Sequence, residues 1–435
     1  MNLIKYILPI ATLLLLFVSC RTPQQGFFAT KTPHEQYKAG LDKAGLSNTR
    51  LGALWVLAAN ASLAKPVSVT VPYKETGYFE MGVPMAAGYA FSANQGEVVM
   101  VNVSANPVSG FILFTELWQV NGADKKLLAP GDTTNNSIRY EIKTSGRYIV
   151  RLQPELLQGL AYTITISTGP SLAFPVNKEY NPKIISVWGD SRDANARSHE
   201  GIDILAGKYT PVVACADGTI TSVREGGLGG KVVFMRPGGS SYNFYYAHLD
   251  TQLVQPGQRV FTGDRLGLIG NTGNARFTAA HLHFGIYGDG GAVDPLPFLN
   301  LNRPIEKTVK ADTSYLAKYV RTKSKAILFA QPSANASQKL TLENDLILKV
   351  IAATDDFYKV ELTDSSIGFI KSSFVNRQPL RKATLSQATV LLDRPGDHAA
   401  AKKLLSKGAG ITVLGMHNSF YYVKYDDVNG WVKKM

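Results

Sequence analysis

The sequence is poor in cysteine. Its 435 residues include two cysteines, Cys20 and Cys215, which excludes the disulfide framework that supports small secreted domains. Cys215 lies in the apolar run PVVACADGTI, and we expect it to be a small buried hydrophobic residue. The fold must then depend on burial of apolar side chains or on metal binding. The length predicts two to four domains, and 39 Gly and 21 Pro favour a loop-rich β protein.

The sequence also lacks a dense basic run. The formal net charge is +13, but the 46 Lys and Arg residues are spread along the chain. An excess of base favours anionic partners such as cell-wall polymer, lipid headgroups or nucleic acid. We expect most of the excess to be a solvated surface. Because the start of the chain predicts export, we expect no nucleic acid partner.

One apolar run stands out, and it lies at the start of the chain. After Lys5, the run ILPIATLLLLFVS is too short for a comfortable membrane span and has the layout of a secretory signal over residues 1–19. Its end resembles the lipobox of bacterial lipoproteins, which implies that Cys20 carries a lipid anchor and that residues 20–33 form a tether. A plain signal anchor with an incidental cysteine is the alternative. Arg21 follows, so the acidic residue tied to inner-membrane retention is missing, and we expect the outer membrane, facing the periplasm.

Two periodicities divide the next part of the chain. Apolar residues recur at helical spacing over residues 34–66, with Asn48 and Thr49 as candidate caps of a second helix. Over residues 67–169 short alternating runs are separated by Gly, Asn, Asp and Pro, which predicts a β-sandwich. In pattern alone this part resembles the pre-peptidase C-terminal type of jelly-roll accessory domain. We expect a binding or spacing module, or a purely structural one.

A weak internal repeat lies at the end of the chain. FYKVELTDSSIGFIKSSF begins at Phe357, and FYYVKYDDVNGWVKKM begins at Phe420. The two copies resemble bacterial SH3-like domains, which implies two small β-barrels over residues 313–377 and 382–435. They would either recognise cell-wall peptide or pack on the central domain without binding anything.

Four of the seven histidines lie in the middle of the chain. The segment His199-Glu200-Gly201-Ile202-Asp203 begins like the zinc-protease motif H-E-x-x-H, which needs both ligands on one helix face. The glycine and the alternating apolar residues predict a loop that enters a strand instead. Along a strand, His199 and Asp203 would lie some 13 Å apart at about 3.3 Å per residue. A His/Asp pair is a reasonable zinc pair, but both can reach one metal only if the backbone turns at Gly201.

The other three histidines lie in strand-like segments. His281 and His283 alternate with Leu282 and Phe284, so both histidines face one side of a predicted strand. His248 lies in the run FYYAHLD, and we expect it to point from a strand end into a cavity. Taken alone, each is weak evidence for a site, and a structural histidine in the core is the alternative for His248.

Together these segments resemble the lysostaphin/LytM-type zinc metallopeptidase family. The matching elements within residues 183–300 are WGDSRDANARSHEGIDI, TPVVACADGTI, YYAHL, VQPGQRVFTGDRLGLIGNTGN and HLHFGIY. The resemblance implies an antiparallel β domain with a groove. It also implies that His199, Asp203 and His283 hold Zn²⁺ with a fourth position open for water, and that His281 and His248 line the reacting centre.

Such a peptidase needs a general base beside the metal. Zinc lowers the pKa of its bound water and polarises the scissile carbonyl. Glu200 stands next to a ligand, so we expect its side chain to point away. A histidine exchanges protons near neutral pH, and His281 is our first choice for the base. His248 would stabilise the oxyanion or share proton transfer, and the two roles could be exchanged.

The leading hypothesis is a lipid-anchored zinc endopeptidase, monomeric, that cuts peptide cross-links of peptidoglycan. The alternative is a non-catalytic activator of cell-wall amidases, as in LytM-type domains that have lost ligands. A secreted protease for Gly-rich proteins is a third hypothesis, against which lipidation argues. The predicted fold is mainly β: short N-terminal helices and a sandwich, a central peptidase domain, and two SH3-like barrels.

Overall fold

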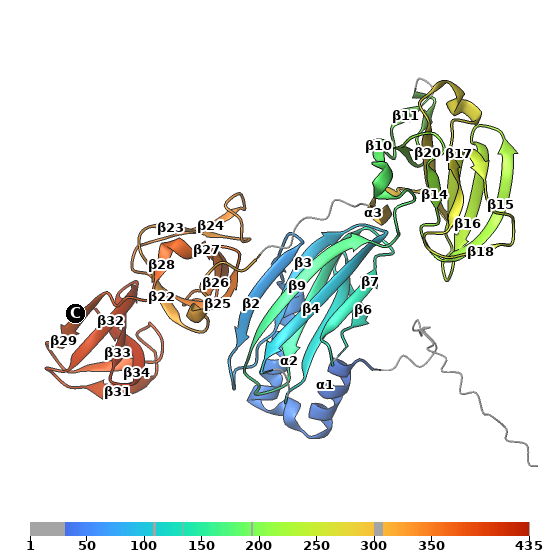
Figure 1. Cartoon of the computed structure of the whole chain (residues 1–435). Helices are drawn as coiled ribbons and strands as arrows, with labels where there is room; N and C mark the ends of the chain where they lie inside the picture. Colours follow the sequence, from blue (N-terminus) through green and yellow to red (C-terminus); the bar gives the residue numbers. More distant parts are fainter. Residues whose placement is uncertain (1–30, 108–109, 133, 193–194, 300–307, 435) are drawn as a thin grey trace, which may run out of the picture.

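The structure is a computed structural model that describes residues 31–107, 110–132, 134–192, 195–299 and 308–434. It is mainly β, as the alternating patterns predict. The sandwich lies between the central domain on one side and two C-terminal units on the other (Figure 1). The predicted signal peptide and Cys20 lie outside the described residues. Within the described ranges, no helix combines the length and the apolar character that crossing a membrane requires.

Two helices precede the sandwich, and the second packs against its strands β3 (Ala87–Ala93) and β8 (Gly146–Pro154). The Thr32 hydroxyl accepts the N–H of Glu35 while the Glu35 carboxylate accepts the N–H of Thr32, a capping box that starts the first helix. The Thr49 hydroxyl accepts the N–H of Gly52 and starts the second. The Trp55 indole N–H donates to the Pro154 carbonyl at 2.9 Å, which ties the second helix to the sheet. The elements are α1 (Pro33–Lys43), the 3₁₀ turn η1 (Leu46–Asn48) and α2 (Arg50–Ala64).

Strands β1 to β9 form two sheets over one core. One sheet runs β1-β3-β8-β5-β6 and the facing sheet contains β2-β9-β4-β7. Tyr89 and Val150 of the first sheet meet Val99 and Ile164 of the second in this core, all fully buried. The bounds are β1 (Val67–Ser68), β2 (Tyr73–Phe79), β3 (Ala87–Ala93), β4 (Glu97–Asn106), β5 (Leu113–Asn121), β6 (Asp124–Pro130), β7 (Ser137–Glu141), β8 (Gly146–Pro154) and β9 (Leu160–Pro170).

The central domain is a larger antiparallel sheet. Its strands run β10-β13-β20-β17-β16-β15-β18, with β14, β19 and β21 paired beside this path. Cys215 is 2% exposed in its core, and burial raises the pKa of the thiol to about 12, which confirms the predicted apolar role. The bounds are η2 (Lys178–Tyr180), β10 (Lys183–Ser186), β11 (Ser191–Arg192), β12 (Arg197–Ser198), β13 (Ile202–Leu205), β14 (Pro211–Val213), β15 (Gly218–Gly226), β16 (Gly230–Pro237), β17 (Asn243–Gln252), β18 (Arg259–Val260), β19 (Arg265–Ile269), η4 (Gly273–Phe277), β20 (His281–Gly288), β21 (Gly291–Val293) and α3 (Leu296–Leu299).

The central domain docks on the end of the sandwich through α3. The Phe298 ring lies against Gly96, where a Cβ atom would come within 2.2 Å of it. The Gln95 side chain donates to the Tyr242 hydroxyl at 2.8 Å. Apolar and polar contacts together therefore fix how the domain sits on the sandwich.

The first C-terminal unit continues the sheet of the sandwich. Thr76 and Gly77 of β2 pair with Ala353 and Ala352 of β25. The sequence predicts separate units, and this sheet crosses their boundary because β2 otherwise presents an unpaired edge. The elements of this unit are η5 (Thr313–Tyr315), β22 (Tyr319–Thr322), β23 (Ala326–Phe329), β24 (Gln338–Leu342), β25 (Ile347–Thr354), β26 (Phe357–Glu361), β27 (Ile367–Lys371), η6 (Ser372–Phe374) and β28 (Val375–Asn376).

The second C-terminal unit repeats part of this arrangement. Gly368 of β27 and Gly430 of β34 occupy matching positions, and a Cβ atom at either would clash with a leucine, Leu328 or Leu391. Among the described strands, pairing closes neither unit into the predicted barrel, because the outer strands are short and end each path. The bounds are β29 (Arg381–Thr384), β30 (Thr389–Leu392), β31 (Ala401–Leu405), β32 (Gly410–His417), β33 (Phe420–Tyr425) and β34 (Val428–Lys433).

Candidate active site

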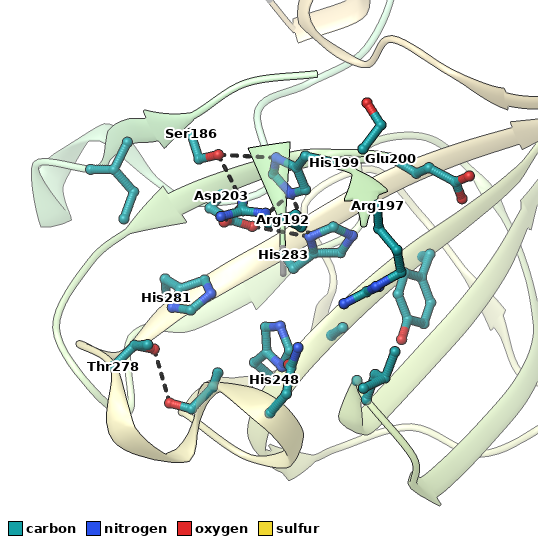
Figure 2. A pocket seen from close by; sticks show the side chains of 18 of the residues that line it. Ser186, Arg192, Arg197, His199, Glu200, Asp203, His248, Thr278, His281 and His283 are labelled. Carbon is teal, nitrogen blue, oxygen red and sulfur yellow. Dashed lines mark hydrogen bonds and ion pairs between the residues drawn. The ribbon is translucent and has the colours of Figure 1, made fainter. Parts of the chain in front are cut away.

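Neighbouring strands of the central domain bring the predicted site residues together. Asp203 of β13 pairs with His283 of β20, and His283 pairs in turn with Ala247 of β17. His248 follows on β17, and His281 lies two positions before His283 on the same face of β20. Figure 2 shows these side chains converging on one cavity.

A turn before β13 brings His199 to this group. Gly201 lies in the turn, and a Cβ atom there would come within 2.6 Å of the Phe284 carbonyl and 2.8 Å of the His283 ring. Only glycine permits this approach. The turn places Nε2 of His199 3.1 Å from Oδ1 of Asp203, where an extended strand would hold the two residues far apart.

Three donor atoms form a small triangle. Nε2 of His199 lies 3.0 Å from Nδ1 of His283, which lies 3.0 Å from Oδ1 of Asp203. In tetrahedral coordination with bonds of about 2.0–2.1 Å, ligand atoms lie roughly 3.3 Å apart, so the triangle is close to the size that zinc requires. Two imidazoles and a carboxylate are also a donor set that suits zinc. The residues present therefore fit the metal.

The electrostatics of the group favour an ionised carboxylate. Burial by itself would raise the pKa of Asp203, but hydrogen bonds and positive charge from His199 and His283 outweigh it and hold the pKa far below its usual range. Burial lowers the pKa of His283, against the attraction of Asp203. A neutral imidazole beside a carboxylate is the protonation state in which both can bind a cation.

Two side chains that the sequence did not flag support the ligands. Arg192 donates to Oδ2 of Asp203 at 2.5 Å and to the Ser186 hydroxyl at 2.7 Å. Nδ1 of His199 lies 2.9 Å from the Val187 carbonyl, so an N–H there leaves Nε2 for a metal. Ser186 ends the short strand β10 and Arg192 ends the two-residue strand β11, and nothing in their spacing indicates this role.

A backbone carbonyl orients the ring of each of the other two histidines, His248 and His281. Nδ1 of His248 lies 2.9 Å from the Thr272 carbonyl, and Nδ1 of His281 lies 2.8 Å from the Ala279 carbonyl. A carbonyl only accepts, so each Nδ1 carries the proton and each Nε2 is left with a lone pair. The two rings lie 5.0 Å apart, centroid to centroid.

The backbone and the protonation of His248 are both unusual. Its φ is 59°, in the left-handed region that a side chain of this size rarely adopts. Such strain persists only where the surroundings impose it, and it gathers at functional sites. Burial, followed by the nearby charges of His281 and His283, lowers its pKa to about 4, so the ring is neutral at physiological pH.

The cavity has a volume of about 670 Å³ and is open to solvent. Glu200 lines its rim, and Figure 2 shows its side chain directed away from His248 and His281. Burial and the charge of Glu200 raise the pKa of Tyr287, which also lines the cavity, to about 12. All the lining residues belong to the central domain, so neither the sandwich nor the C-terminal units cover the cavity in this structure.

Comparison with known proteins agrees with this geometry. Residues 197–295 match Peptidase family M23. The chain is 43% identical over 101 residues to an uncharacterized metalloprotease of Haemophilus influenzae, covering 23% of this chain and 21% of the relative. It is 34% identical over 142 residues to the peptidoglycan DD-endopeptidase ShyA of Vibrio cholerae, covering 32% of this chain and 31% of the relative. It is 33% identical over 119 residues to the murein hydrolase activator NlpD of Escherichia coli, covering 27% of this chain and 29% of the relative.

The match defines the class of the central domain. Residues 197–295 of the central domain are similar to Peptidase family M23, and the relatives that match this part of the chain include proteins named as peptidoglycan endopeptidases. The chain spans less than a third of the length of each of these three relatives. What the whole chain does is therefore taken up as a proposal.

Proposed function

We propose that this protein is a zinc endopeptidase that hydrolyses peptide cross-links of peptidoglycan in the cell envelope. One observation carries the proposal. The buried triangle of His199, Asp203 and His283 shares a cavity with two further histidines whose Nε2 lone pairs are available. A structural zinc site would have four protein donors and no open cavity beside it.

His199, Asp203 and His283 would hold the ion. When bound, zinc supplies a polarised substrate carbonyl and a more acidic attacking water. Arg192 occupies Oδ2 of Asp203 and so directs Oδ1 toward the two imidazoles. The Val187 carbonyl fixes the tautomer and the ring orientation of His199.

His281 would be the general base. Its Nδ1–H is held by the Ala279 carbonyl, so Nε2 takes the proton of the attacking water and then passes it to the leaving amine. His248 is neutral, and its Nδ1–H is also held, so it accepts a proton before it can donate to the developing oxyanion. Since its ring lies 5.0 Å from that of His281, centroid to centroid, we assign His248 the sharing of proton transfer.

An amidase activator is the second candidate, because one relative carries the name of a murein hydrolase activator. An activator needs no metal ligands, whereas this chain keeps three donors in a triangle of zinc size. Purified protein that cuts peptidoglycan without an added amidase supports the peptidase. Protein that cuts nothing alone, but speeds an added amidase, supports the activator.

The ends of the chain complete the proposal. Residues 1–19 would be removed as a signal peptide, and Cys20 would carry lipid in the outer membrane, facing the periplasm. Residues 67–169, 183–300, 313–377 and 382–435 would be the domains of the chain, the first and third of which share a sheet through β2 and β25, and the last two would be SH3-like modules that bind the cell wall. Mass spectrometry of the mature N-terminus checks the lipid, and an unmodified Cys20 contradicts it.

The decisive experiment is mass spectrometry of peptidoglycan fragments after incubation with wild type or with His281→Ala. The proposal predicts new free amino groups at peptide cross-links with wild type and almost none with the variant. It also predicts about one zinc per purified chain. Cleavage between the sugar and the peptide would show an amidase, and cleavage that survives chelation would rule out the metal mechanism.

A further inference from the structure

A second cavity lies between the two C-terminal units. Its volume is about 200 Å³. The first unit contributes Tyr319, Lys349 and Glu361, and the second contributes Asp393, Arg394 and Trp431. The C-terminal units lie on the other side of the sandwich from the central domain, so this cavity is separate from the candidate active site (Figure 1). We call it the junction groove.

Tertiary contacts hold both walls of the junction groove in place. The Met416 N–H donates to the Asp345 carbonyl at 2.8 Å, which joins the backbones of the two units. A Cβ atom at Gly415 would come within 3.0 Å of that same carbonyl, so the close approach favours glycine there. Lys349 forms an ion pair of 2.5 Å with Glu80 of the sandwich. The groove is therefore built from three parts of the chain.

An aromatic surface forms the apolar side of the groove. The rings of Tyr319 and Tyr422 lie 4.6 Å apart, and those of Tyr422 and Trp431 lie 5.0 Å apart. Tyr319 is 41% exposed although it belongs to this stack, whereas Trp431 is 4% exposed. Tyr319 thus presents a partly open ring that Tyr422 and Trp431 hold in place, and such a ring is suited to binding another molecule.

Charges of both signs stand beside the aromatic surface. Arg394 has no hydrogen bond or ion pair with any described residue, and its side chain is exposed. One carboxylate oxygen of Asp393 accepts the Ala400 N–H, which leaves the other free. Glu361 lies close enough to Lys349 to help raise its pKa. Because Lys349 is paired with Glu80, the groove presents, among its described residues, one unpaired cation, Arg394, beside a carboxylate from each unit, Glu361 and Asp393.

We propose that the junction groove binds a short peptide that carries both a free carboxylate and a free ammonium group. The carboxylate would pair with Arg394, whose guanidinium can bind it in a bidentate manner. The ammonium would pair with Asp393 or Glu361, and the aliphatic part would lie on the exposed ring of Tyr319. At about 200 Å³ the groove is smaller than the roughly 300–1,000 Å³ of a drug-sized site, so it admits the end of a peptide.

The source of the peptide follows from the proposed function, on which this assignment rests. An uncross-linked stem peptide of peptidoglycan ends in a free carboxylate and carries a free amine where no cross-link has formed. Because the groove lies away from the active site, binding there would hold the enzyme on one strand of wall while another is cut.

Titration of the full chain with stem tripeptides released from peptidoglycan tests the proposal. We expect Arg394→Glu to weaken binding at least tenfold. Lys407→Glu makes the same charge change at an exposed turn of the same unit outside the groove, and we expect binding within twofold of wild type. Amidation of the peptide carboxylates should weaken binding to wild type, and acetylation of the amine should do so as well.

Three results would overturn the proposal. They are no binding by wild type, equal binding by Arg394→Glu and wild type, or equal loss in Arg394→Glu and Lys407→Glu. Cleavage of a soluble cross-linked dimer is measured in parallel, and we expect it to be unchanged in both variants. If wild type binds the peptide but does not cut the dimer, the proposed peptidase activity fails while the binding site stands.

Discussion

Two buried polar clusters of this protein differ in what their atoms face. Between the sandwich and the first C-terminal unit, Glu75 is fully buried and Lys359 is 5% exposed, with 3.4 Å between Nζ and the carboxylate. The hydroxyls of Tyr73, Tyr89 and Tyr162 all donate to the same carboxylate. We call Glu75, Lys359 and the three tyrosines the junction cluster. Its polar groups bond to one another, so it offers no free group to a ligand.

The histidine cluster is buried to a similar degree but is not closed. His199, Asp203, His248 and His281 are 4–8% exposed. Within the described residues, no hydrogen bond occupies Nε2 of His248 or His281, and both line a cavity. Burial of polar groups is costly in either place. The comparison teaches that burial alone does not mark a site, and that unused donors or acceptors facing a cavity do.

Removal of a ligand should break the histidine cluster most completely. With His283→Ala we expect zinc to fall from about one per chain to none and peptidoglycan cleavage to become undetectable, because two donors bind zinc far more weakly than three. Metal analysis and muropeptide mass spectrometry measure both. His398→Ala, at an exposed histidine outside the cluster, should retain both metal and activity.

Removal of the base should lower turnover without loss of metal. For His281→Ala we expect kcat to fall about 10²–10⁴-fold, the usual contribution of a general base. Zinc content should stay near one per chain, since His281 is not a ligand. A larger fall in His248→Ala than in His281→Ala would exchange the two roles.

Substitution of Arg192, which donates to Asp203, should have an intermediate effect on zinc binding. For Arg192→Ala we expect zinc affinity to fall about 10–100-fold, because partners of metal ligands typically contribute that much. Competition with a chelator of known affinity measures it. If excess zinc does not restore the activity of Arg192→Ala, then Arg192 acts on the substrate and not through Asp203.

Substitutions in the junction cluster should lower the stability of the protein and leave its activity unchanged. Lys359→Met leaves the Glu75 carboxylate without its cation, and we expect the free energy of unfolding to fall by about 3–5 kcal/mol. Zinc content and kcat should match wild type. The double variant Glu75→Gln/Lys359→Met should recover much of the loss in chemical denaturation, because no buried charge then remains. Equal losses in both variants would mean that Lys359 acts through packing.

Glu200→Gln should have the smallest effect. Its side chain is directed away from both cavity histidines (Figure 2), so we expect kcat within about twofold of wild type. A folded, zinc-loaded variant without activity would make Glu200 the base in place of His281.

Much of the candidate site could be predicted from the sequence. The spacing of His281 and His283 places both on one face of a strand, and β20 has that geometry. Gly201 was predicted to permit a turn between His199 and Asp203, and the structure has the turn. Arg192 and Ser186 were missed because they end strands that are too short to show a periodic pattern. The predicted closed barrels are not found among the described strands, and the pairing of β2 with β25 joins the sheet of the sandwich to the first C-terminal unit, a contact that no local pattern indicates.

The sequence by itself determined which chemical groups this protein has and in what order: a histidine and an aspartate around a glycine, a distant H-x-H pair, and alternating runs that fold as β-strands. Only the tertiary structure decided which nitrogen of each histidine is free, which arginine holds Asp203, and where the two C-terminal units leave a groove. Local patterns fix strands and faces, because they depend on neighbours in the chain. Contacts such as Lys359 with Glu75 join residues 284 positions apart, and no local pattern encodes them.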